Sequence, residues 1–276
     1  MPPLAFAKTE AHGNDFIVVS DKNVREGARE LARAMCDRLR GVGGDGLILF
    51  HADGERFVMT IINSDGSPAE ISGNGLRCLG AYLSHAGLAT GPEIEVSTGA
   101  GLLKLMLLGR NDTTFRFRAD MGLPREIAVG VELAIGDETV VATTLSMGNP
   151  HCVVFTERSK LRDIGPILER HRNFPDKTNV ELVEPIDGRA IHMAIWERGA
   201  GETASSGTGS AAAAVASIIN EHVESPVQVH CPGGMIEVAW TEGESVIVTG
   251  DASVVAEGHY LIDWRIATEA QRHGGS

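Results

Sequence analysis

The sequence predicts an α+β protein of two pseudo-symmetric domains, each a β-sheet wrapped round a central helix. Three observations lead to this class. An internal repeat runs through the chain at a nearly constant offset, and a repeat decides the architecture. Runs of β-branched and aliphatic residues outnumber helical patterns in both halves. At 276 residues, the chain is long enough for two domains of ordinary size.

The repeat is visible at four separated places. The segment GNDFIVV, which begins at Gly13, returns 135 positions later as GNPHCVV, and both are typical of turns that enter strands. Ser72 and Ser206, 134 positions apart, each begin a glycine-rich turn that opens a helix. Two further pairs share this offset: Asn63 with Glu197, and Asp45 with Asn179. We therefore expect homologous domains over residues 1–125 and 126–276, with the last strands crossing back to the first half.

Three segments have helical patterns: residues 28–40, 74–86 and 208–222. The last of them is almost wholly small or apolar from residue 209 to 219, and a helix that is apolar on every side belongs inside a core. Strands are expected at residues 57–62, 114–117, 153–155 and 245–248.

The composition narrows the function classes. A formal charge of −13 opposes binding to nucleic acid or to an anionic membrane. No apolar run approaches the ~18 residues of a membrane span, and no signal-like segment begins the chain, so we expect a cytoplasmic protein. The cysteines show no regular spacing, which favours reduced, buried thiols over disulfides; they are Cys36, Cys78, Cys152 and Cys231.

Two of the predicted helices begin with sequences suited to anion binding. A buried helix N-terminus carries unpaired N–H groups and the positive end of the helix dipole. The repeat puts such ends at Ser72-Gly73-Asn74 and at Ser206-Gly207-Thr208. We expect both to converge on one carboxylate across the domain cleft. The serines also have a purely structural interpretation as N-caps.

Cofactor and metal motifs are absent. The GxGxxG match at residues 41–46 follows a helix, whereas a dinucleotide fingerprint follows a strand. The glycine-rich stretch at residues 199–210 lacks the GK[ST] ending of a phosphate loop. None of the ten histidines forms HExxH or pairs with cysteines at zinc spacing. We expect no cofactor and no metal.

Several segments of the sequence resemble the signature blocks of diaminopimelate epimerases, both in their order and in their spacing. They are HGNDFIVV, GVGGDGLILF, NSDGSPAEISGNGLRC, SMGNPHCVVF, FPDKTNVELVE and WERGAGETASSGTGSAAAA. The resemblance implies the fold of that family and interconversion of LL- and meso-diaminopimelate, for lysine and peptidoglycan synthesis, without pyridoxal phosphate or metal. In the family, one cysteine thiolate removes the α-proton and an opposed thiol returns one to the other face.

The resemblance also assigns site residues. The positions Asn14, Asn63, Asn149, Asn179 and Arg198 match residues that bind the substrate, several at its distal amino-carboxylate. The helix-start residues Gly73, Asn74, Gly207 and Thr208 would hold the α-carboxylate, while His151 and Glu197 match groups near the reacting carbon. Gly46 departs from the family, because many relatives carry glutamine there.

The catalytic-cysteine positions fall on Ser72 and Ser206. A helix N-terminus can lower a thiol pKa of ~8.5 by several units, but an alcohol begins several units higher. A serine would therefore need a partner such as His151 or Glu197 to act as a base. Cys78 lies more than a helical turn beyond Ser72 and is no substitute.

The serines fit either an engineered replacement of cysteine or a natural variant with slow, altered or lost chemistry. Three alternatives to the epimerase remain: a racemase or isomerase of another amino acid, a non-catalytic amino-acid binding protein, and a hydrolase with Ser206 as nucleophile. The absence of a GxSxG elbow counts against the hydrolase. Beyond a small amino-acid substrate, the partner we expect is a second copy of the chain, as a homodimer.

Overall fold

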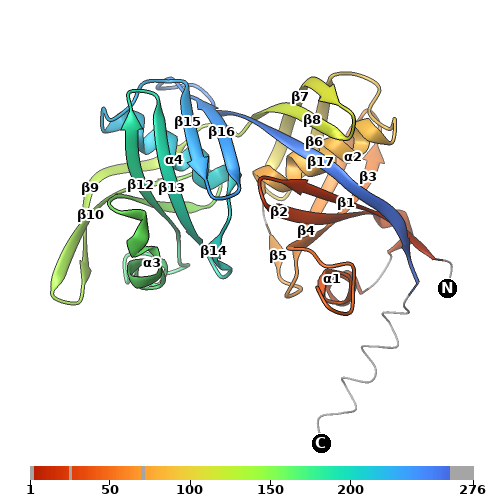
Figure 1. Ribbon diagram of the computed structural model, residues 1–276, viewed down its shortest axis with the longest axis horizontal. Coiled ribbons are helices and arrows are strands. Elements are labelled where there is room, and N and C mark those ends of the chain that lie inside the picture. Colours follow the sequence, from red (N-terminus) through yellow and green to blue (C-terminus); the bar gives the residue numbers. More distant parts are fainter. Residues whose placement is uncertain (1–2, 25–26, 70–71, 262–276) are drawn as a thin grey trace, which may run out of the picture. The chain divides into compact units, whose positions relative to one another are not determined.

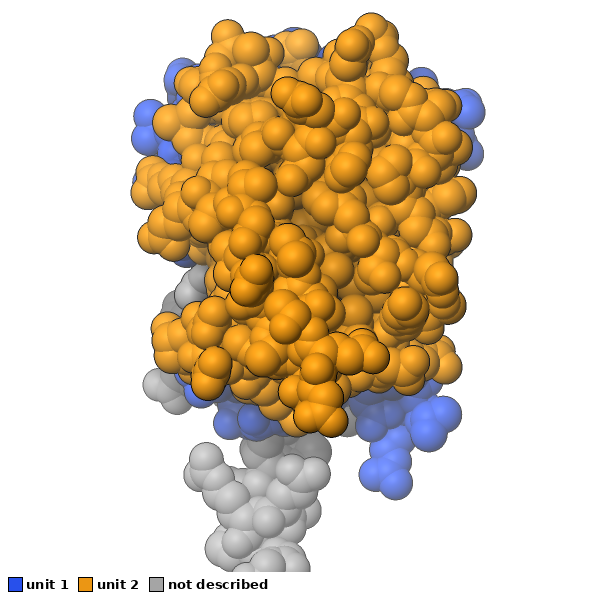
Figure 2. All heavy atoms as spheres, turned by 90° about the vertical axis from the view of Figure 1, so that its left-hand side faces the viewer, with its two compact units in different colours: residues 1–117, 251–276 blue, residues 118–250 orange. Residues whose placement is uncertain are grey.

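The computed structural model describes residues 3–24, 27–69 and 72–261. The chain forms two compact units, coloured separately in Figure 2: residues 1–117 with 251–276 form unit 1, and residues 118–250 form unit 2. The backbone passes from one unit to the other at Phe117/Arg118 and again at Gly250/Asp251.

The described residues of unit 1 form a β-sheet with two α-helices. Its elements in chain order are β1 (Leu4–Ala11), β2 (Asn14–Ser20), a short 3-10 helix (Asp21–Asn23), α1 (Ala28–Cys36), β3 (Gly46–Asp53), β4 (Arg56–Asn63), β5 (Pro68–Ala69), α2 (Gly73–His85), β6 (Glu93–Thr98), β7 (Gly101–Asn111) and the start of β8 (Thr114–Asp120). The second part of β17 (Ile247–Tyr260) pairs antiparallel with β1, so the C-terminal strand completes this sheet.

Unit 2 repeats this order. Its elements are β9 (Arg125–Ile135), β10 (Glu138–Ser146), β11 (Pro150–Phe155), a short 3-10 helix (Arg158–Lys160), α3 (Leu161–Glu169), β12 (Asn179–Asp187), β13 (Ala190–Glu197), β14 (Gly201–Thr203), α4 (Gly207–Ile219), β15 (Val227–Cys231), β16 (Gly234–Ala239) and the start of β17. Figure 1 shows α4 behind the strands β12, β13 and β15 of this unit.

Strand pairing confirms the duplicated α+β fold. In unit 1, β2 and β3 are parallel, β3 and β4 antiparallel, and β4 and β6 parallel. In unit 2, β11 and β12 are parallel, β12 and β13 antiparallel, and β13 and β15 parallel. The helices α2 and α4 contain 13 residues each and begin 134 positions apart, at Gly73 and Gly207.

The helices α2 and α4 are central to their units, as predicted. Every residue of α4 from Gly207 to Ser217 is buried, and the helix contacts strands β10 to β13, β15 and β16. Its four consecutive alanines, Ala211 to Ala214, are small and apolar, so they can be buried on every side of the helix. In α2, the burial extends from Gly73 to Ala81 and includes Leu83.

Some element boundaries differ from the prediction. The helix predicted over residues 28–40 ends at Cys36, because Asp37 turns the chain and accepts hydrogen bonds from the backbone N–H of Leu39 and Arg40. The helix predicted to reach residue 222 ends at Ile219. Helix α3 was missed, since Gly165 and Pro166 interrupt its pattern.

All four cysteines are unpaired thiols. Three of them are buried, but Cys231 is partly exposed, so the prediction of burial was wrong for that residue. Within the described part of the chain, no helix is both long and apolar enough to cross a membrane.

Candidate functional site

The N-terminus of α2 is the first half of the candidate site. Ser72 has the extended backbone of an N-cap, with φ −142° and ψ 118°, and its Oγ accepts a hydrogen bond from the N–H of Gly75 at 3.0 Å. Gly73 and Asn74 follow and are buried. A first turn of this geometry directs N–H groups outward from the helix end, as an anion site requires.

The N-terminus of α4 repeats this geometry in unit 2. Ser206 has φ −144° and ψ 132°, and its Oγ accepts from the N–H of Gly209 at 3.2 Å. Its Oγ lies 3.5 Å from the hydroxyl of Thr208, which in turn lies 3.4 Å from the amide nitrogen of Asn149. The N-cap interpretation is therefore correct for both serines, and it is compatible with a role toward a ligand.

A buried imidazole–carboxyl pair lies beside α4. His151 on β11 and Glu181 on β12 have fully buried side chains, and His151 Nδ1 lies 2.6 Å from Glu181 Oε1. His151 Nε2 lies 2.9 Å from Asn149 Oδ1, so Nε2 carries a proton that it donates to this amide oxygen. Burial raises the pKa of Glu181, and His151 opposes that rise. The other oxygen of Glu181 has no hydrogen-bond partner within the described residues.

Sequence reasoning missed Glu181. A signal was present, because this glutamate interrupts the apolar strand Asn-Val-Glu-Leu-Val at residues 179–183. An acidic residue at a buried strand position needs a polar partner. That partner, His151, comes from the neighbouring strand, 30 residues earlier in the sequence.

Glu197 is another carboxyl group of the candidate site in unit 2. It ends β13, and its Oε1 accepts a hydrogen bond from the hydroxyl of Thr203 at 2.6 Å. Burial raises its pKa; hydrogen bonds from Thr203 and Ser206 oppose the rise, and the nearby Glu181 adds to it. A carboxyl group with a raised pKa that touches a serine hydroxyl is suited to general acid–base chemistry.

Asn179 and Arg198 are also brought together in unit 2. The backbone N–H of Arg198 donates to Asn179 Oδ1 at 2.9 Å, and Asn179 Nδ2 donates to the carbonyl of Pro150 at 2.9 Å. These bonds fix the Asn179 side chain between β11 and the end of β13. The Arg198 side chain is partly exposed, and its Nη1 lies 3.5 Å from the carbonyl of Asp176.

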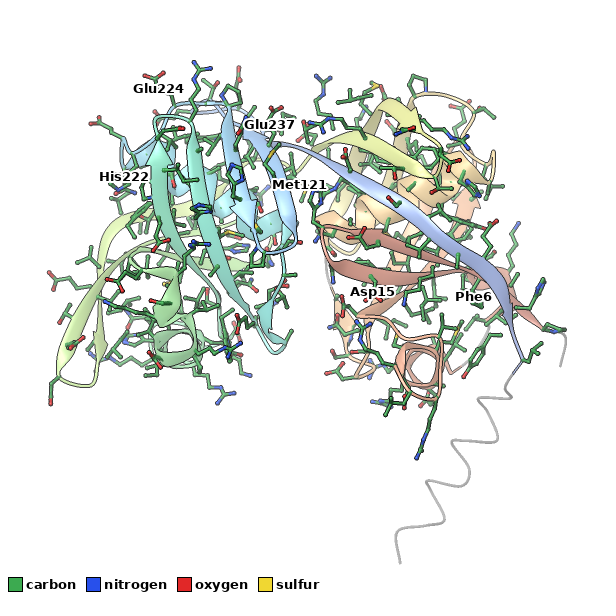
Figure 3. All side chains as sticks on the ribbon, in the orientation of Figure 1. Phe6, Asp15, Met121, His222, Glu224 and Glu237 are labelled. Carbon is green, nitrogen blue, oxygen red and sulfur yellow. The ribbon has the colours of Figure 1, made fainter. Side chains whose placement is uncertain are left out.

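In unit 1, Asn14 is oriented by a network of charges. Its Nδ2 donates to Asp45 Oδ2 at 2.6 Å, and Arg38 holds the other Asp45 oxygen at 2.8 Å. Arg38 also bridges to Asp15, labelled in Figure 3, which pairs with Lys8 at 2.9 Å. With its amide nitrogen directed at Asp45, the Asn14 side chain directs its carbonyl oxygen away from that carboxylate.

This network gives the protein a specific acid sensitivity. Burial raises the pKa of Asp15, but hydrogen bonds from Arg38 and Lys8 outweigh it and lower the pKa from 3.8 to about 2. The stabilisation is complete above pH 3.8 and is lost as the pH falls toward 2. The lowered pKa contributes on the order of 2 kcal/mol to the free energy of unfolding. We expect the free energy of unfolding to fall over this pH window in both proteins, and to fall by about 2 kcal/mol more in the parent than in Asp15→Asn. Parallel denaturant titrations would refute the assignment if both proteins lost the same amount.

Asn63 and Gly46 lie opposite each other on β4 and β3. Asn63 Nδ2 donates to the hydroxyl of Ser67 at 3.0 Å. A Cβ at position 46 would lie 3.1 Å from the carbonyl of Ile62 and 3.2 Å from the ring of Phe16. A side chain at position 46 would therefore require the Ile62 carbonyl or the Phe16 ring to shift by a few tenths of an ångström, and glycine offers no side-chain polar group here.

The structure divides the predicted residues between the two units. Unit 1 holds Asn14, Asn63, Ser72, Gly73 and Asn74; unit 2 holds Asn149, His151, Asn179, Glu197, Arg198, Ser206, Gly207 and Thr208. Among residues 3–24, 27–69 and 72–261, no group of three or more His, Cys, Asp or Glu side chains is arranged to bind a metal ion.

Comparisons with known proteins identify the family of the chain. The sequence matches the diaminopimelate epimerase family over residues 6–127 and 143–255. It is 40% identical to a diaminopimelate epimerase of Carboxydothermus hydrogenoformans, over 94% of this chain and 100% of that protein. A diaminopimelate epimerase of Desulfitobacterium hafniense is 39% identical, over 94% and 99%.

Solved structures of lower identity share the fold. A probable proline racemase from Agrobacterium radiobacter superposes with a TM-score of 0.73 at 15% identity, over 94% of this chain and 93% of that one. A Bacillus anthracis protein of the PhzF phenazine biosynthesis family superposes with a TM-score of 0.71 at 14% identity, over 95% and 100%. The duplicated fold, the equivalent helix N-termini of the two units and the sequence matches lead to one conclusion: the chain belongs to the diaminopimelate epimerase family.

Proposed function

We propose that this protein interconverts LL- and meso-diaminopimelate by two-base proton transfer without a cofactor, at a rate limited by serine at both base positions. The observation that carries this proposal is the pair of serine-capped helix N-termini at equivalent positions of the repeat, Ser72 and Ser206. Membership of the family supports the substrate. The reaction would serve lysine and peptidoglycan precursor synthesis.

Two-base chemistry on one α-carbon requires both N-termini to act on the same substrate, one from each face. The first-turn N–H groups of α2 and α4 would bind the α-carboxylate, together with Asn74 and Thr208. They would also stabilise the charge that spreads onto the carboxylate when the α-proton leaves. Binding at these groups does not depend on whether the cap residue ends in oxygen or sulfur.

Proton transfer, unlike binding, does depend on whether the side chain of the cap residue ends in oxygen or in sulfur. A serine hydroxyl does not ionise near neutral pH, even at a helix N-terminus. In unit 2, Glu197 would act as the base through Ser206, since its raised pKa matches that task. His151, held by Glu181, would supply a proton-bearing imidazole near the reacting carbon.

Asn14, Asn63, Asn149, Asn179 and Arg198 would bind the substrate, several of them at its distal amino-carboxylate. Arg198 can bind a carboxylate through two parallel N–H···O bonds, and Asn14 offers its carbonyl oxygen to the ammonium. We expect diaminopimelate to bind more tightly than lysine, because lysine lacks the second carboxylate. Arg198→Ala should lose roughly ten- to a hundredfold in affinity for diaminopimelate and little for lysine.

Calorimetric titration of both ligands measures this difference. Arg162→Ala is the matched control, because that arginine is an exposed residue of unit 2 paired with Glu202. Equal affinities for the two ligands, or an Arg198→Ala variant that binds like the parent, would exclude the distal pocket.

A racemase or isomerase of another amino acid is the second candidate function. The packing of Phe16 over Gly46 favours it, because it removes a polar contact from the region assigned to the distal group. A binding protein without catalysis is distinguished from both by α-proton exchange. We further propose that the protein acts in the cytoplasm as a homodimer; its unpaired thiols suit a reducing compartment.

A further inference from the structure

Arg77 is a buried cation that the proposed mechanism does not use. It lies in the second turn of α2, and its side chain is fully buried. Its Nη2 donates to Asn74 Oδ1 and lies 3.5 Å from Nδ1 of His12. Its Nε and Nη1 have no hydrogen-bond partner in the described part of the chain. Buried polar atoms are nearly always paired, so this arrangement calls for an explanation.

The fold itself does not require an arginine here. The repeat places Ala211 of α4 at the position of Arg77, also fully buried and 134 positions later. Both helices have the same length and the same serine cap. A small apolar residue therefore satisfies the packing at this point of the fold, and a buried guanidinium with unpaired N–H groups is the costlier choice.

The guanidinium remains charged in its buried position. Burial lowers the pKa of Arg77 to about 10, which still leaves it protonated at neutral pH. No carboxylate of the described residues forms an ion pair with it; Asp251, which acts on it through space, pairs instead with Arg116 at 3.3 Å. No side chain of the described residues therefore neutralises its positive charge by direct contact, and its Nη2 contacts Asn74 in the first turn of α2.

The guanidinium also connects two turns that carry proposed substrate-binding residues. Asn74 belongs to the first turn of α2, and His12 begins the turn that leads through Gly13 to Asn14. Because Arg77 holds the carbonyl oxygen of the Asn74 side chain, the amide nitrogen of that side chain points the opposite way, as a hydrogen-bond donor.

We propose that Arg77 is a positioning residue for carboxylate binding in unit 1. It orients the Asn74 amide toward the α-carboxylate, and it adds positive charge to the N-terminus of α2. The neutral α4 helix, with Ala211, relies on Asn149 and Thr208 instead. This inference rests on the proposed function for the identity of the ligand, diaminopimelate, but not for the orientation of Asn74.

The test compares Arg77→Met and Arg77→Lys with the parent, and with Leu83→Met as a control for repacking on the same helix. A purely structural arginine would lose stability and binding together. We expect Arg77→Met to keep or raise the melting temperature, because a buried charge is replaced by an apolar chain, and to bind diaminopimelate at least about tenfold more weakly. The affinity of Arg77→Lys for diaminopimelate should lie between those of the parent and Arg77→Met, because lysine keeps the positive charge but lacks the planar guanidinium.

Calorimetry, thermal melting and the NMR resonance of the Asn74 side-chain amide give separate readouts. A shift of that resonance in Arg77→Met, absent in Leu83→Met, is expected even without ligand. If the parent binds no diaminopimelate, the proposed function fails and the Asn74 resonance alone decides the role of Arg77. Parental affinity in Arg77→Met, affinity that falls only in step with stability, or an unmoved Asn74 resonance would overturn the inference.

Discussion

Replacing Ser72 and Ser206 together by cysteine is expected to raise the rate of diaminopimelate epimerisation by orders of magnitude. The physical reason is the acidity of the reacting atom. A thiol has a pKa of ~8.5, which a helix N-terminus lowers further, whereas an alcohol does not ionise in this range. Both caps already have the geometry that would lower a thiol pKa, with the side chain directed at the first-turn N–H groups.

Each single replacement should raise the rate less than the double replacement. Each direction of the reaction needs a base on one face and an acid on the other, so one cysteine leaves one face with serine. The assay follows the stereochemistry of each diaminopimelate isomer for parent, singles and double. Binding serves as the control and should be unchanged, because backbone N–H groups hold the carboxylate. A parent that matches or exceeds the double variant would show that another base carries the reaction.

Glu197→Gln is expected to slow the α-proton exchange that the parent protein, with its two serines, still catalyses. The reduction should be about 10²- to 10⁴-fold for the proton on the substrate face that unit 2 serves. Glutamine keeps the shape of the side chain and the hydrogen bond from Thr203 but cannot accept a proton. Because burial raises the pKa of Glu197, the parental rate should rise with pH through a value above the ordinary 4.5. The rise marks deprotonation of the base and should be absent from Glu197→Gln.

The loss in Glu197→Gln should be smaller when Ser206 is cysteine, since the thiolate can then remove the proton itself. Glu202→Gln is the matched control, because Glu202 is an exposed carboxylate on β14 that pairs with Arg162. Equal exchange by Glu197→Gln and the parent would remove Glu197 from the proton pathway and direct attention to His151.

The sequence was sufficient to predict the duplicated fold and the two capped helix N-termini. The constant offset between Ser72 and Ser206 predicted the duplication, and the glycine-rich turns predicted where α2 and α4 begin. The burial of α4 followed from its alanine content. These features are local in sequence, and local patterns determine helix starts and helix faces.

Features that depend on tertiary contacts could not be predicted in this way. The pairing of Glu181 with His151 joins two strands, and the burial of the Arg77 guanidinium depends on what surrounds α2. The early end of α1 reflects capping by Asp37, and α3 forms despite its glycine and proline because it packs on strands β9, β12 and β13. Packing overrides propensity in such cases.

Deuterium incorporation at the α-carbon of LL-diaminopimelate, measured by NMR in deuterated water, tests the central claim most directly. The parent protein is expected to bind the ligand, to exchange its α-proton slowly, and to convert it to the meso isomer at a comparable rate. The Ser72→Cys/Ser206→Cys variant should do the same much faster. Binding without any α-proton exchange, in both the parent and the double-cysteine variant, would contradict the epimerase assignment.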